Sequence, residues 1–492
     1  MNVLLLYPEF PDTFWSFKHA LKFVWKKASL PPLGLLTVAA MLPRTWEKRL
    51  VDLNVRKLTP KHLQWADLVF VSAMIAQRES AHALIARCKA AGKIVVAGGP
   101  LFTSEHAQFP TVDHFVLNEA EVTLPEFVQD FERGCAQPKY ASTEFPDVRQ
   151  TPAPLWELAE LNRYASMCVQ YSRGCPFDCE FCDVTAKFGH RPRIKSAEQI
   201  LVELDGLYRQ GWRGQVFFVD DNLIGNKRAL KTDLLPALIE WQKQRRGLPL
   251  YTEASINLAD DEELMRAMVE AGFDQVFIGI ETPDEAGLAE CNKRQNQGRD
   301  LVADVKRMQR AGLQVQGGFI VGFDSDTATI FRRQMEFIQK SGIVTAMVGL
   351  LNALPDTKLY ARLKRENRLL GQSTGNNVDG TTNFVPHMDM KKLREGYRSI
   401  LEGIYAPRPY YRRVRTFLRE YKHPKFSVSL DWRRISAFLH STVRLGVIGR
   451  ERFQYWRLLA WTFFHRPRHI PLAITLAIYG HHFRKCCAAM DE

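Results

Sequence analysis

Three cysteines within eight residues, Cys175, Cys179 and Cys182, constrain this chain more than any other feature of its sequence. Their spacing is C-x₃-C-x₂-C, and Phe181 stands immediately before the last of them. Thiolates crowded in this way suit a soft metal centre, and iron–sulfur clusters are held by cysteine sulfur. A fully ligated cluster takes four thiolates, so three cysteines would leave one iron open to a ligand that is not protein.

Two other interpretations of these cysteines stay open on the residues alone. One is a structural zinc knot, which needs a fourth Cys or His at finger-like spacing. The nearest histidine is His190, eight residues after Cys182. The other is three unrelated cysteines of a protein core.

The cysteine motif resembles that of the radical S-adenosylmethionine (SAM) enzymes. In that family the open iron of a [4Fe–4S] cluster binds the amino and carboxylate groups of SAM, and an electron from the cluster splits SAM into methionine and a 5′-deoxyadenosyl radical. The resemblance implies that Cys175, Cys179 and Cys182 are the metal ligands. It also implies SAM as cofactor and an electron donor such as flavodoxin or ferredoxin.

Length and composition indicate an ordinary globular protein of two to four domains, with 492 residues, 46% of them hydrophobic and 25% charged. Nine cysteines in a chain of this length do not form a disulfide framework. We find no signal peptide after Met1 and no run of roughly 18 apolar residues. We therefore expect a cytoplasmic protein, or one peripheral at the inner face of the membrane, where the thiols stay reduced.

Residues 1–133 predict a doubly wound, flavodoxin- or Rossmann-like α/β domain, because short apolar runs alternate with helical patterns. The expected strands are 2–7, 49–53, 68–72, 93–97 and 114–117, and the expected helices are 34–42, 80–91 and 122–132. Ligands of such sheets lie beyond the carboxyl ends of the strands. The candidate residues there are Asn54, Ser72, Gly98, Gly99, Asn118 and Glu119. Plain turn chemistry is the competing explanation for all six.

Three segments, 29–36, 97–100 and 118–121, resemble the cobalamin-binding domain that precedes many radical SAM cores. The resemblance implies cobalamin near the six residues just named. It departs from the D-x-H-x-x-G pattern, because Asn54 stands where the histidine would be. This departure fits family members that hold cobalamin without a histidine ligand, and it equally fits a domain that has lost the cofactor.

After a Pro-rich linker at 134–161, residues 162–370 repeat the strand–helix alternation at a longer pitch. The expected strands are 167–172, 215–220, 250–255, 275–280, 314–321 and 344–351, with helices at 197–209, 229–244, 261–271, 300–311 and 326–339. Six such units resemble the partial (β/α)₆ barrel of the radical SAM fold. Barrel enzymes place their chemistry at the carboxyl ends of the strands.

Polar and glycine-bearing residues follow these strands in the order that the family shows. The resemblance implies SAM contacts at Phe181, Asp220, Asp221, Glu253, Ser255, Glu281, Gly318 and Ile320. Taken singly, each has a structural explanation, and Asp220 and Asp221 also suit a helix N-cap. We expect Cys88, Cys135, Cys168 and Cys291 to be structural, with a catalytic role for Cys291 as the alternative. The catalytic residues themselves stay unassigned.

The C-terminal region, 371–492, carries most of the net charge of +13, since residues 405–492 hold 17 Lys and Arg against 5 Asp and Glu. We expect a loop at 371–383 that could cross the barrel mouth, a helix at 388–404, and further helices rich in Arg and aromatic residues. The apolar run 470–479 is too short to span a bilayer. Basic charge with aromatics suits a membrane surface or nucleic acid, and we prefer the membrane. A helical domain with a solvated basic face is the structural alternative.

The order of the three regions resembles the hopanoid C-2 methylase-like, cobalamin-dependent radical SAM methyltransferases. This resemblance implies methyl transfer to an unactivated carbon of a small molecule, and the basic tail would fit a hydrophobic or lipid-like one. Two alternatives remain. One is a radical SAM enzyme that couples, cyclises or oxidises its substrate without methyl transfer. The other is a cluster-bearing nucleic-acid-binding protein.

Overall fold

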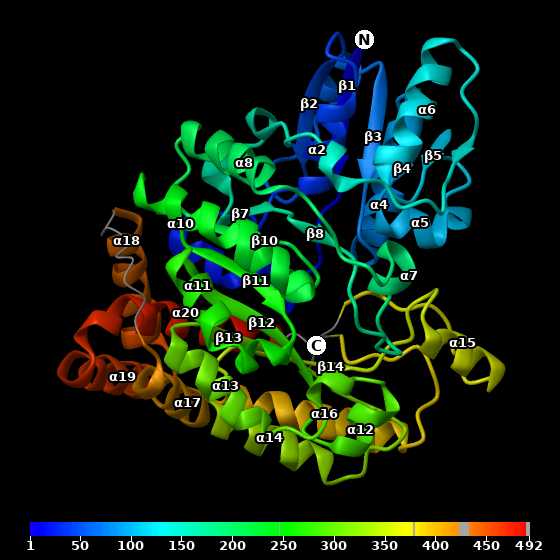
Figure 1. Cartoon of the computed structure of the whole chain (residues 1–492). Coiled ribbons are helices and arrows are strands. Elements are labelled where there is room, and N and C mark those ends of the chain that lie inside the picture. The colour runs from blue at the N-terminus through cyan, green and yellow to red at the C-terminus, as the bar shows by residue number, and fades with distance from the viewer. Residues whose placement is uncertain (246, 377–378, 423–431, 489–492) are drawn as a thin grey trace.

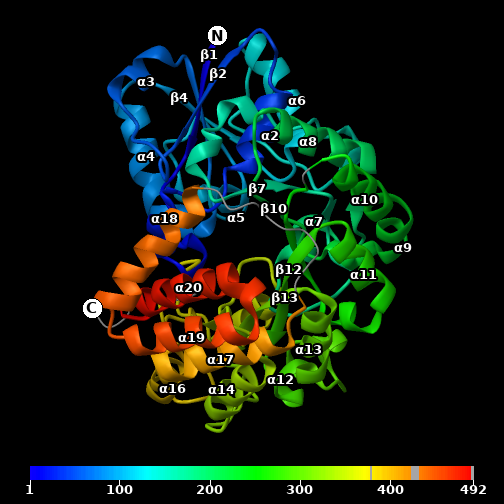
Figure 2. The ribbon, with the colours of Figure 1, turned by 90° about the vertical axis from the view of Figure 1, so that its left-hand side faces the viewer.

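The computed structural model describes residues 1–245, 247–376, 379–422 and 432–488, the side chains of 432–434 excepted. Part of the expected loop at 371–383 and the side chain of Trp432 therefore lie outside the described residues. The chain forms two six-stranded sheets and a helical tail, which pack against one another (Figure 1, Figure 2). The predicted fold class is confirmed, with parallel strands in both sheets.

The N-terminal sheet has the strand order β2-β1-β3-β4-β5-β6. Its strands are β1 (Asn2–Tyr7), β2 (Glu47–Asp52), β3 (Leu68–Ser72), β4 (Ile94–Gly98), β5 (His114–Val116) and β6 (Lys139–Tyr140). β1 lies in the interior of the sheet, so the chain runs outward from it in both directions. The gap between such oppositely running halves is where doubly wound sheets bind ligands.

Helices cover both faces of this sheet because successive apolar side chains of each strand point to opposite sides. Val3 and Leu5 belong to one core cluster, while Leu4 and Leu6 belong to another. The first face is covered by α2 (Leu33–Met41) and α6 (Ala120–Glu132). The second is covered by α3 (Pro60–Trp65), α4 (Arg78–Ala90) and α5 (Pro100–Glu105).

The second sheet has the order β7-β10-β11-β12-β13-β14, so each new strand is added on the same side of the previous one. Its strands are β7 (Ser166–Val169), β10 (Gln215–Phe218), β11 (Leu250–Ala254), β12 (Phe273–Glu281), β13 (Gln314–Val321) and β14 (Ala346–Leu350). A short hairpin of β8 (Ser172–Arg173) and β9 (Arg193–Ile194) lies apart from them. The sequential order is that of a partial barrel.

Helices link the strands of the partial barrel. They are α7 (Val184–Phe188), α8 (Ala197–Arg209), α9 (Lys227–Ala229), α10 (Leu235–Lys243), α11 (Glu262–Glu270), α12 (Glu285–Glu290), α13 (Leu301–Ala311), α14 (Ile330–Ser341) and α15 (Lys358–Arg365). The helix expected at 229–244 contains a π-helical stretch at Leu230–Leu234. The linker 134–161 is less irregular than its prolines suggest, because it supplies β6 and two short 3₁₀ turns.

The described part of the tail is helical, as expected. Its helices are α16 (Met390–Tyr405), α17 (Pro407–Glu420), α18 (Trp432–Ser441) with a π-helical continuation at Thr442–Ile448, α19 (Arg452–His465) and α20 (Ile470–Ala488). The hydroxyl of Tyr405 donates a hydrogen bond to the carbonyl of Ala346, so α16 protects the exposed edge of β14. α20 reaches the N-terminal region, where Phe17 stacks on His482 with ring centroids 5.2 Å apart. No described helix combines the length and hydropathy needed to cross a membrane.

The segment after α15 runs back to the N-terminal domain. Asn352 donates a hydrogen bond to the carbonyl of Thr381 at 3.1 Å, which holds the segment beyond the carboxyl end of β14. Arg78 of α4 donates to the carbonyl of Ser373 at 3.0 Å. The described part of the expected loop therefore connects the barrel to the N-terminal domain.

Candidate active site

The three motif cysteines lie on one loop between β8 and α7, where all three thiols are free and half-buried. Gly174 lets the chain enter this loop with φ of +96°. A Cβ at Gly174 would stand 2.9–3.0 Å from the carbonyl oxygens of residues 188, 189 and 191, so only glycine fits there. The fold thus holds Cys175, Cys179 and Cys182 together after the first barrel strand.

Side-chain amides approach two of the three sulfur atoms. The Nδ2 of Asn222 lies 4.0 Å from the Sγ of Cys175, and the Nε2 of Gln295 lies 3.8 Å from the Sγ of Cys179. Hydrogen-bond donors directed at sulfur are a means by which proteins tune a metal–thiolate site. These two come from the segments that follow β10 and β12.

Burial raises the pKa of all three thiols, and that of Cys182 reaches about 12. The ammonium group of Lys293 opposes this effect at Cys179 and Cys182. The cysteines are therefore protonated at neutral pH until a metal replaces the protons.

Within the described ranges, no three His, Cys, Asp or Glu side chains are grouped closely enough to hold one metal ion. A [4Fe–4S] cluster makes a different demand, because each cysteine binds a separate iron atom. Three free thiols on one loop, with amide donors beside two of them, fit that demand.

Three carboxyl groups lie at the ends of β10 and β11: Asp220 is buried, and Asp221 and Glu253 are half-buried. Burial raises the pKa of Asp220 to about 7 against the opposing hydrogen bonds from Ser172 and the amide of Tyr171. Burial also raises the pKa of Asp221 to about 6. For Glu253, burial and then the charges of Asp221 and Asp220 raise the pKa to about 8. A cationic ligand would relieve this mutual repulsion, which fits the amino and sulfonium groups of SAM.

β12 ends in an ion pair. The Nζ of Lys293 lies 2.7 Å from the Oε1 of Glu281, whose backbone has φ of +62°. Gly279 makes room for this pair, because a Cβ there would collide with the carboxylate and stand 2.8 Å from the Nζ. Asn296 donates hydrogen bonds to the carbonyls of Gly279 and Ile280, which fixes the bend of the strand. Glu281 is thus held by a partner that the sequence pattern did not single out.

Ser255 lies at the same edge, directly after β11. Its amide donates to the Oδ1 of Asn222 at 3.1 Å, and its hydroxyl donates to the Oδ1 of Asn257 at 2.6 Å. Since Asn222 also approaches Cys175, one hydrogen-bonded chain leads from the cysteine loop to the end of β11.

β13 passes close to β12 on the inside of the barrel. A Cβ at Gly318 would lie 2.8 Å from the ring of Phe277, so the glycine allows this close approach. Ile320 and Phe181 pack against the same hydrophobic cluster, which contains the buried Cys291. Burial raises the pKa of Cys291 to about 12, as for a structural thiol.

Gly98 and Gly99 form a close-packed turn at the end of β4. A Cβ at Gly98 would lie 2.6 Å from the carbonyl oxygen of Val116, and one at Gly99 would collide with the hydroxyl of Ser72. Gly99 has φ of +91° and ψ of −179°, a conformation that is essentially restricted to glycine. The bare backbone at this edge fits a bulky, flat cofactor that must approach closely.

The side chain of Asn54 is bound to the local backbone, whereas Asn118 is held through its own main-chain N–H. Asn54 accepts a hydrogen bond from the amide of Phe10 at 2.8 Å and donates to the carbonyl of Pro8 at 3.0 Å. Asn118 takes φ of +64°, and its amide donates to the hydroxyl of Thr103 at 3.0 Å. Both residues shape the edge of the sheet.

Glu119, directly before α6, belongs to an ion network that joins the N-terminal domain to the β8–β9 hairpin. Its carboxylate lies 2.7 Å from the guanidinium groups of both Arg173 and Arg193. Arg173 also lies 2.7 Å from Glu121. Burial alone would raise the pKa of Glu121, but Arg173 outweighs it and lowers the pKa to about 2. The carboxyl end of the N-terminal sheet is thereby attached to a residue two positions before Cys175.

Sequence reasoning missed Arg173, Arg193 and Glu121 as functional candidates. No periodicity or spacing signals them, because the contacts connect residues 52 to 74 positions apart. Two hints were available: Arg173 lies two positions before Cys175, and Glu121 lies in the segment 118–121 that resembles the cobalamin-binding domain.

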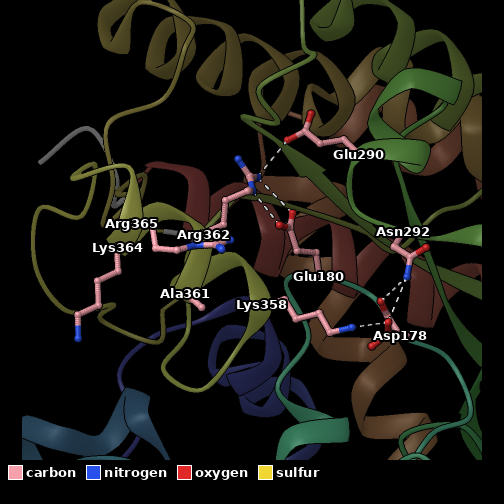
Figure 3. A pocket seen from close by; sticks show the side chains of 9 residues that line it. All are labelled: Asp178, Glu180, Glu290, Asn292, Lys358, Ala361, Arg362, Lys364 and Arg365. Carbon is pink, nitrogen blue, oxygen red and sulfur yellow. Dashed lines mark hydrogen bonds and ion pairs between the residues drawn. The ribbon is translucent and has the colours of Figure 1, made fainter.

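A charged groove of about 860 Å³ lies on the outer side of the cysteine loop (Figure 3). Asp178 and Glu180, which flank Cys179, pair there with Lys358 and Arg362 of α15. The amide of Leu359 also donates to the carbonyl of Glu180 at 2.9 Å. α15 therefore supports the cysteine loop from behind.

Comparisons with known proteins assign the three regions separately. The B12 binding domain model matches residues 27–128, and the Radical SAM superfamily model matches residues 169–338. A domain of unknown function, DUF4070, matches residues 357–492.

The curated relatives cover nearly the whole chain. An uncharacterized methyltransferase from Synechocystis sp. is 43% identical over 98% of this chain and 91% of its own length. Hopanoid C-2 methylase from Rhodopseudomonas palustris is 38% identical over 78% of this chain and 74% of its own length. The chain belongs to the cobalamin-dependent radical SAM methyltransferases. It is therefore an enzyme.

Solved structures share the fold of this methyltransferase at low sequence identity. The cobalamin-dependent SAM radical enzyme OxsB, with aqua-cobalamin bound, has a TM-score of 0.63 at 14% identity, over 99% of this chain and 80% of its own. The radical SAM methyltransferase TsrM from Kitasatospora setae has a TM-score of 0.58 at 14% identity, over 76% of this chain and 79% of its own.

Family membership brings three cofactors to the methyltransferase: a [4Fe–4S] cluster, SAM and cobalamin. The donor sets described above fit all three: the thiols of one loop, the carboxyl groups at the ends of β10 and β11, and the glycine turn at the end of β4.

Proposed function

We propose that this methyltransferase cleaves SAM reductively and transfers a methyl group to an unactivated carbon of a hydrophobic, lipid-like small molecule. When bound, the cluster supplies the electron and cobalamin carries the methyl group. The observation that best supports this proposal is the Glu119–Arg173 ion pair of 2.7 Å, which joins the end of the N-terminal sheet to the start of the cysteine loop. It supports a single site with both cofactors.

The chain's own residues divide the work. Cys175, Cys179 and Cys182 would bind the cluster. Asp220, Asp221, Glu253, Ser255 and Glu281 would bind and orient SAM, with Phe181, Gly318 and Ile320 forming its apolar surroundings. Gly98 and Gly99, with Ser72, would let cobalamin lie against the backbone, while Asn54 and Asn118 hold the surrounding turns.

Aromatic side chains on the inner side of the barrel support a hydrophobic substrate. The rings of Phe217 and Tyr251 stack with centroids 4.6 Å apart on neighbouring strands. Trp15, from the N-terminal domain, contacts Phe277 of β12 at 5.2 Å. Along β10, β11 and β12, Phe217, Tyr251 and Phe277 alternate with buried residues that pack under the outer helices. Since successive side chains of a strand point to opposite faces, these three rings lie on the inner face of the barrel. A polycyclic lipid would suit such a lining, and hopanoid lipids are the substrates named for one relative.

The test begins with anaerobic reconstitution with iron, sulfide and hydroxocobalamin, followed by iron and cobalt counts. We expect about four irons and one cobalt per chain. The loaded enzyme is then incubated with SAM, a reductant and polycyclic triterpenoids or, as contrast, polar amino acids. We expect 5′-deoxyadenosine, S-adenosylhomocysteine and a methylated lipid in the first case alone.

Two outcomes would contradict the proposal. Iron without cobalt, together with SAM cleavage, would indicate a radical enzyme that does not transfer methyl groups. Methylation of the polar amino acids in preference to the lipids would overturn the substrate class. The variant Glu253→Gln is the matched check, because it should weaken SAM binding while iron and cobalt stay unchanged.

A further inference from the structure

Helices α18 and α19 expose an unusual number of large apolar side chains. They lie on the side of the molecule that faces the viewer in Figure 2, and we call their exposed apolar side chains the tail face. Phe464 is 79% exposed and Ile448 is 73% exposed. The tail face consists of Ile435, Phe438, Leu439, Val443, Val447, Ile448, Phe453, Trp456, Phe463 and Phe464.

The spacing of these residues makes two helical stripes. Ile435, Leu439, Val443 and Val447 recur every four residues along α18 and its π-helical continuation. On α19, Phe453, Trp456, Phe463 and Phe464 are separated by three, seven and one residues, which also places them on one side of a helix. Trp456 joins the stripes, since its Nε1 donates to the carbonyl of Gly446 at 2.9 Å.

The opposite sides of both helices already pack into the protein. Leu445, Tyr455, Leu458 and Thr462 are buried. Tyr455 also hydrogen-bonds Ser441 at 2.9 Å, which ties α19 to the end of α18. The side chains of the tail face therefore do not contribute to the internal core. An exposed apolar surface of this kind marks an interaction site.

Arginines border the tail face almost without acidic partners. Between residues 435 and 468, six exposed arginines stand against one acidic residue, and the six are Arg444, Arg450, Arg452, Arg457, Arg466 and Arg468. The acidic residue is Glu451, which is buried and lies 2.6 Å from Arg484. The surroundings of the tail face are thus strongly cationic.

We propose that the tail face docks this methyltransferase on an anionic lipid bilayer. Helices with aromatic and aliphatic side chains on one face and arginines at its border bind in the plane of the interface. Anionic headgroups complement the arginines. The aliphatic residues of the tail face, such as Leu439, Val443 and Ile448, can neither stack on bases nor pair with phosphates. They therefore favour a bilayer over nucleic acid as the partner.

The N-terminal region extends the tail face toward the barrel. Trp25 is 69% exposed, and its Nε1 donates to the hydroxyl of Ser436 on α18 at 3.1 Å. Ten residues earlier, the half-exposed Trp15 contacts Phe277 inside the barrel. Docking would therefore bring the barrel near the bilayer, the source of a lipid-like substrate. This last step rests on the proposed function, whereas the docking itself does not.

Co-sedimentation of the full, cofactor-loaded chain with phosphatidylcholine vesicles, with and without phosphatidylglycerol, tests the proposal. We expect binding that increases with the anionic lipid and falls with salt. The combined change Phe453→Gln, Phe463→Gln and Phe464→Gln should weaken binding about a hundredfold, because three aromatic rings lose their place in the interface. Changing Arg450, Arg452 and Arg457 to Gln should lower the affinity for anionic vesicles about fivefold per arginine.

Matched controls separate the tail face from general effects. Val202→Gln, Leu370→Gln and Val385→Gln replace three exposed apolar side chains elsewhere, and Arg228→Gln, Arg266→Gln and Arg332→Gln replace three exposed arginines on the barrel. Both control sets should bind vesicles as the wild type does. Circular dichroism spectra and melting curves confirm that every variant is folded.

Several results would overturn the proposal: no vesicle binding by the wild type, or equal binding by the tail-face variants. Salt-sensitive RNA binding without vesicle binding would assign the surface to nucleic acid. Another contrary result is a wild type that forms a dimer and does not bind vesicles. If the phenylalanine changes dissociated that dimer, the tail face would be assigned to contact with a second copy of the chain. Methylation assays in detergent keep this test apart from the proposed function, because the tail-face variants should retain activity on solubilised substrate.

Discussion

The two six-stranded parallel sheets differ in strand order, and the difference decides where each can bind a cofactor. In the N-terminal sheet the chain starts from the interior strand β1 and runs outward both ways, which places the switch point between β1 and β3. The close-packed turn of Gly98 and Gly99 follows β4, the strand beside β3. In the barrel every strand is added on the same side, so its polar residues gather around one mouth. Similar strand–helix units thus produce a flat edge in one case and an enclosed mouth in the other.

The network of Glu119, Glu121, Arg173 and Arg193 connects the two candidate sites. Arg173 lies on β8, two positions before Cys175, and both glutamates lie at the start of α6 in the N-terminal domain. Carboxylates at a helix N-terminus are also favoured by the helix dipole. Four variants test how far the two sheets act independently.

The largest effect is expected when the cysteine loop loses its ligands. Replacing Cys175, Cys179 and Cys182 by Ala should reduce iron from about four atoms per chain to almost none. Cobalamin binding should persist, because the residues proposed to bind it lie at the end of the N-terminal sheet. Iron and cobalt analysis after reconstitution measures both. Cys135→Ala, at an exposed cysteine, is the control and should retain both metals. Loss of cobalt together with iron would mean that the two sheets do not bind independently.

The next largest effect concerns the link between the sheets. Arg173→Ala leaves Glu121 without its arginine, while Glu119 keeps its ion pair with Arg193. Removal of one side of a buried ion pair costs about 3–5 kcal/mol of unfolding free energy. Thermal unfolding should show a marked fall in Tm. Arg163→Ala removes an exposed ion pair with Glu160 and should cost no more than about 1 kcal/mol.

Acid should weaken the same link. The folded pKa of Glu121, about 2, lies below the ordinary value of 4.5, so its stabilising contribution is complete above pH 4.5 and is lost as the pH falls toward 2. The Arg173→Ala variant should lack this part of the acid sensitivity. Equal acid profiles for variant and wild type would contradict the role of the ion pair.

A smaller and more local effect is expected at the glycine turn. Gly99→Ala forces a side chain into a backbone conformation that costs about 1–3 kcal/mol, and its Cβ collides with Ser72. Cobalamin affinity should fall at least about tenfold, which corresponds to 1.4 kcal/mol, while iron content stays unchanged. Gly34→Ala in α2 is the matched control, since no atom lies within 4 Å of its Cβ position. Titration followed by the cobalamin absorption spectrum provides the measurement.

The smallest effect is a change in pH dependence at the barrel mouth. The folded pKa of Glu253, about 8, lies above the ordinary value of 4.5. The folded apo protein therefore binds the proton more tightly, and the stability from this group falls as the pH rises from 4.5 to 8. Melting curves of Glu253→Gln should be flatter over that range than those of the wild type. Added SAM should flatten the wild-type profile if its positive charge pairs with Glu253.

Local sequence was sufficient for most of the fold. Every barrel strand overlaps an apolar run that was expected to form it, and β1 and β3 match their expected bounds. The helix expected at 388–404 is found as Met390–Tyr405. These elements could be predicted because the periodicity of a strand or a helix can be recognised from a few neighbouring residues.

The candidate site was predictable in part, for the same reason. The cysteines share one loop, and the polar residues follow their strands directly, so spacing alone indicates them. Their surroundings were not predictable. The raised pKa of Glu253 depends on burial beside Asp221 and Asp220, and Glu281 is held by Lys293 across a turn of the chain.

The candidate cysteine ligands, the two regions of alternating strands and helices, and the basic tail could all be recognised in the sequence. Three features follow from the fold alone: Arg173 joins the β8–β9 hairpin to the N-terminal domain, α20 packs on the N-terminal region, and large aromatic residues of α18 and α19 remain exposed. The difference lies in the range of the interactions. Backbone hydrogen bonding and side-chain periodicity act between near neighbours, whereas burial and ion pairing depend on which distant segments share the remaining space.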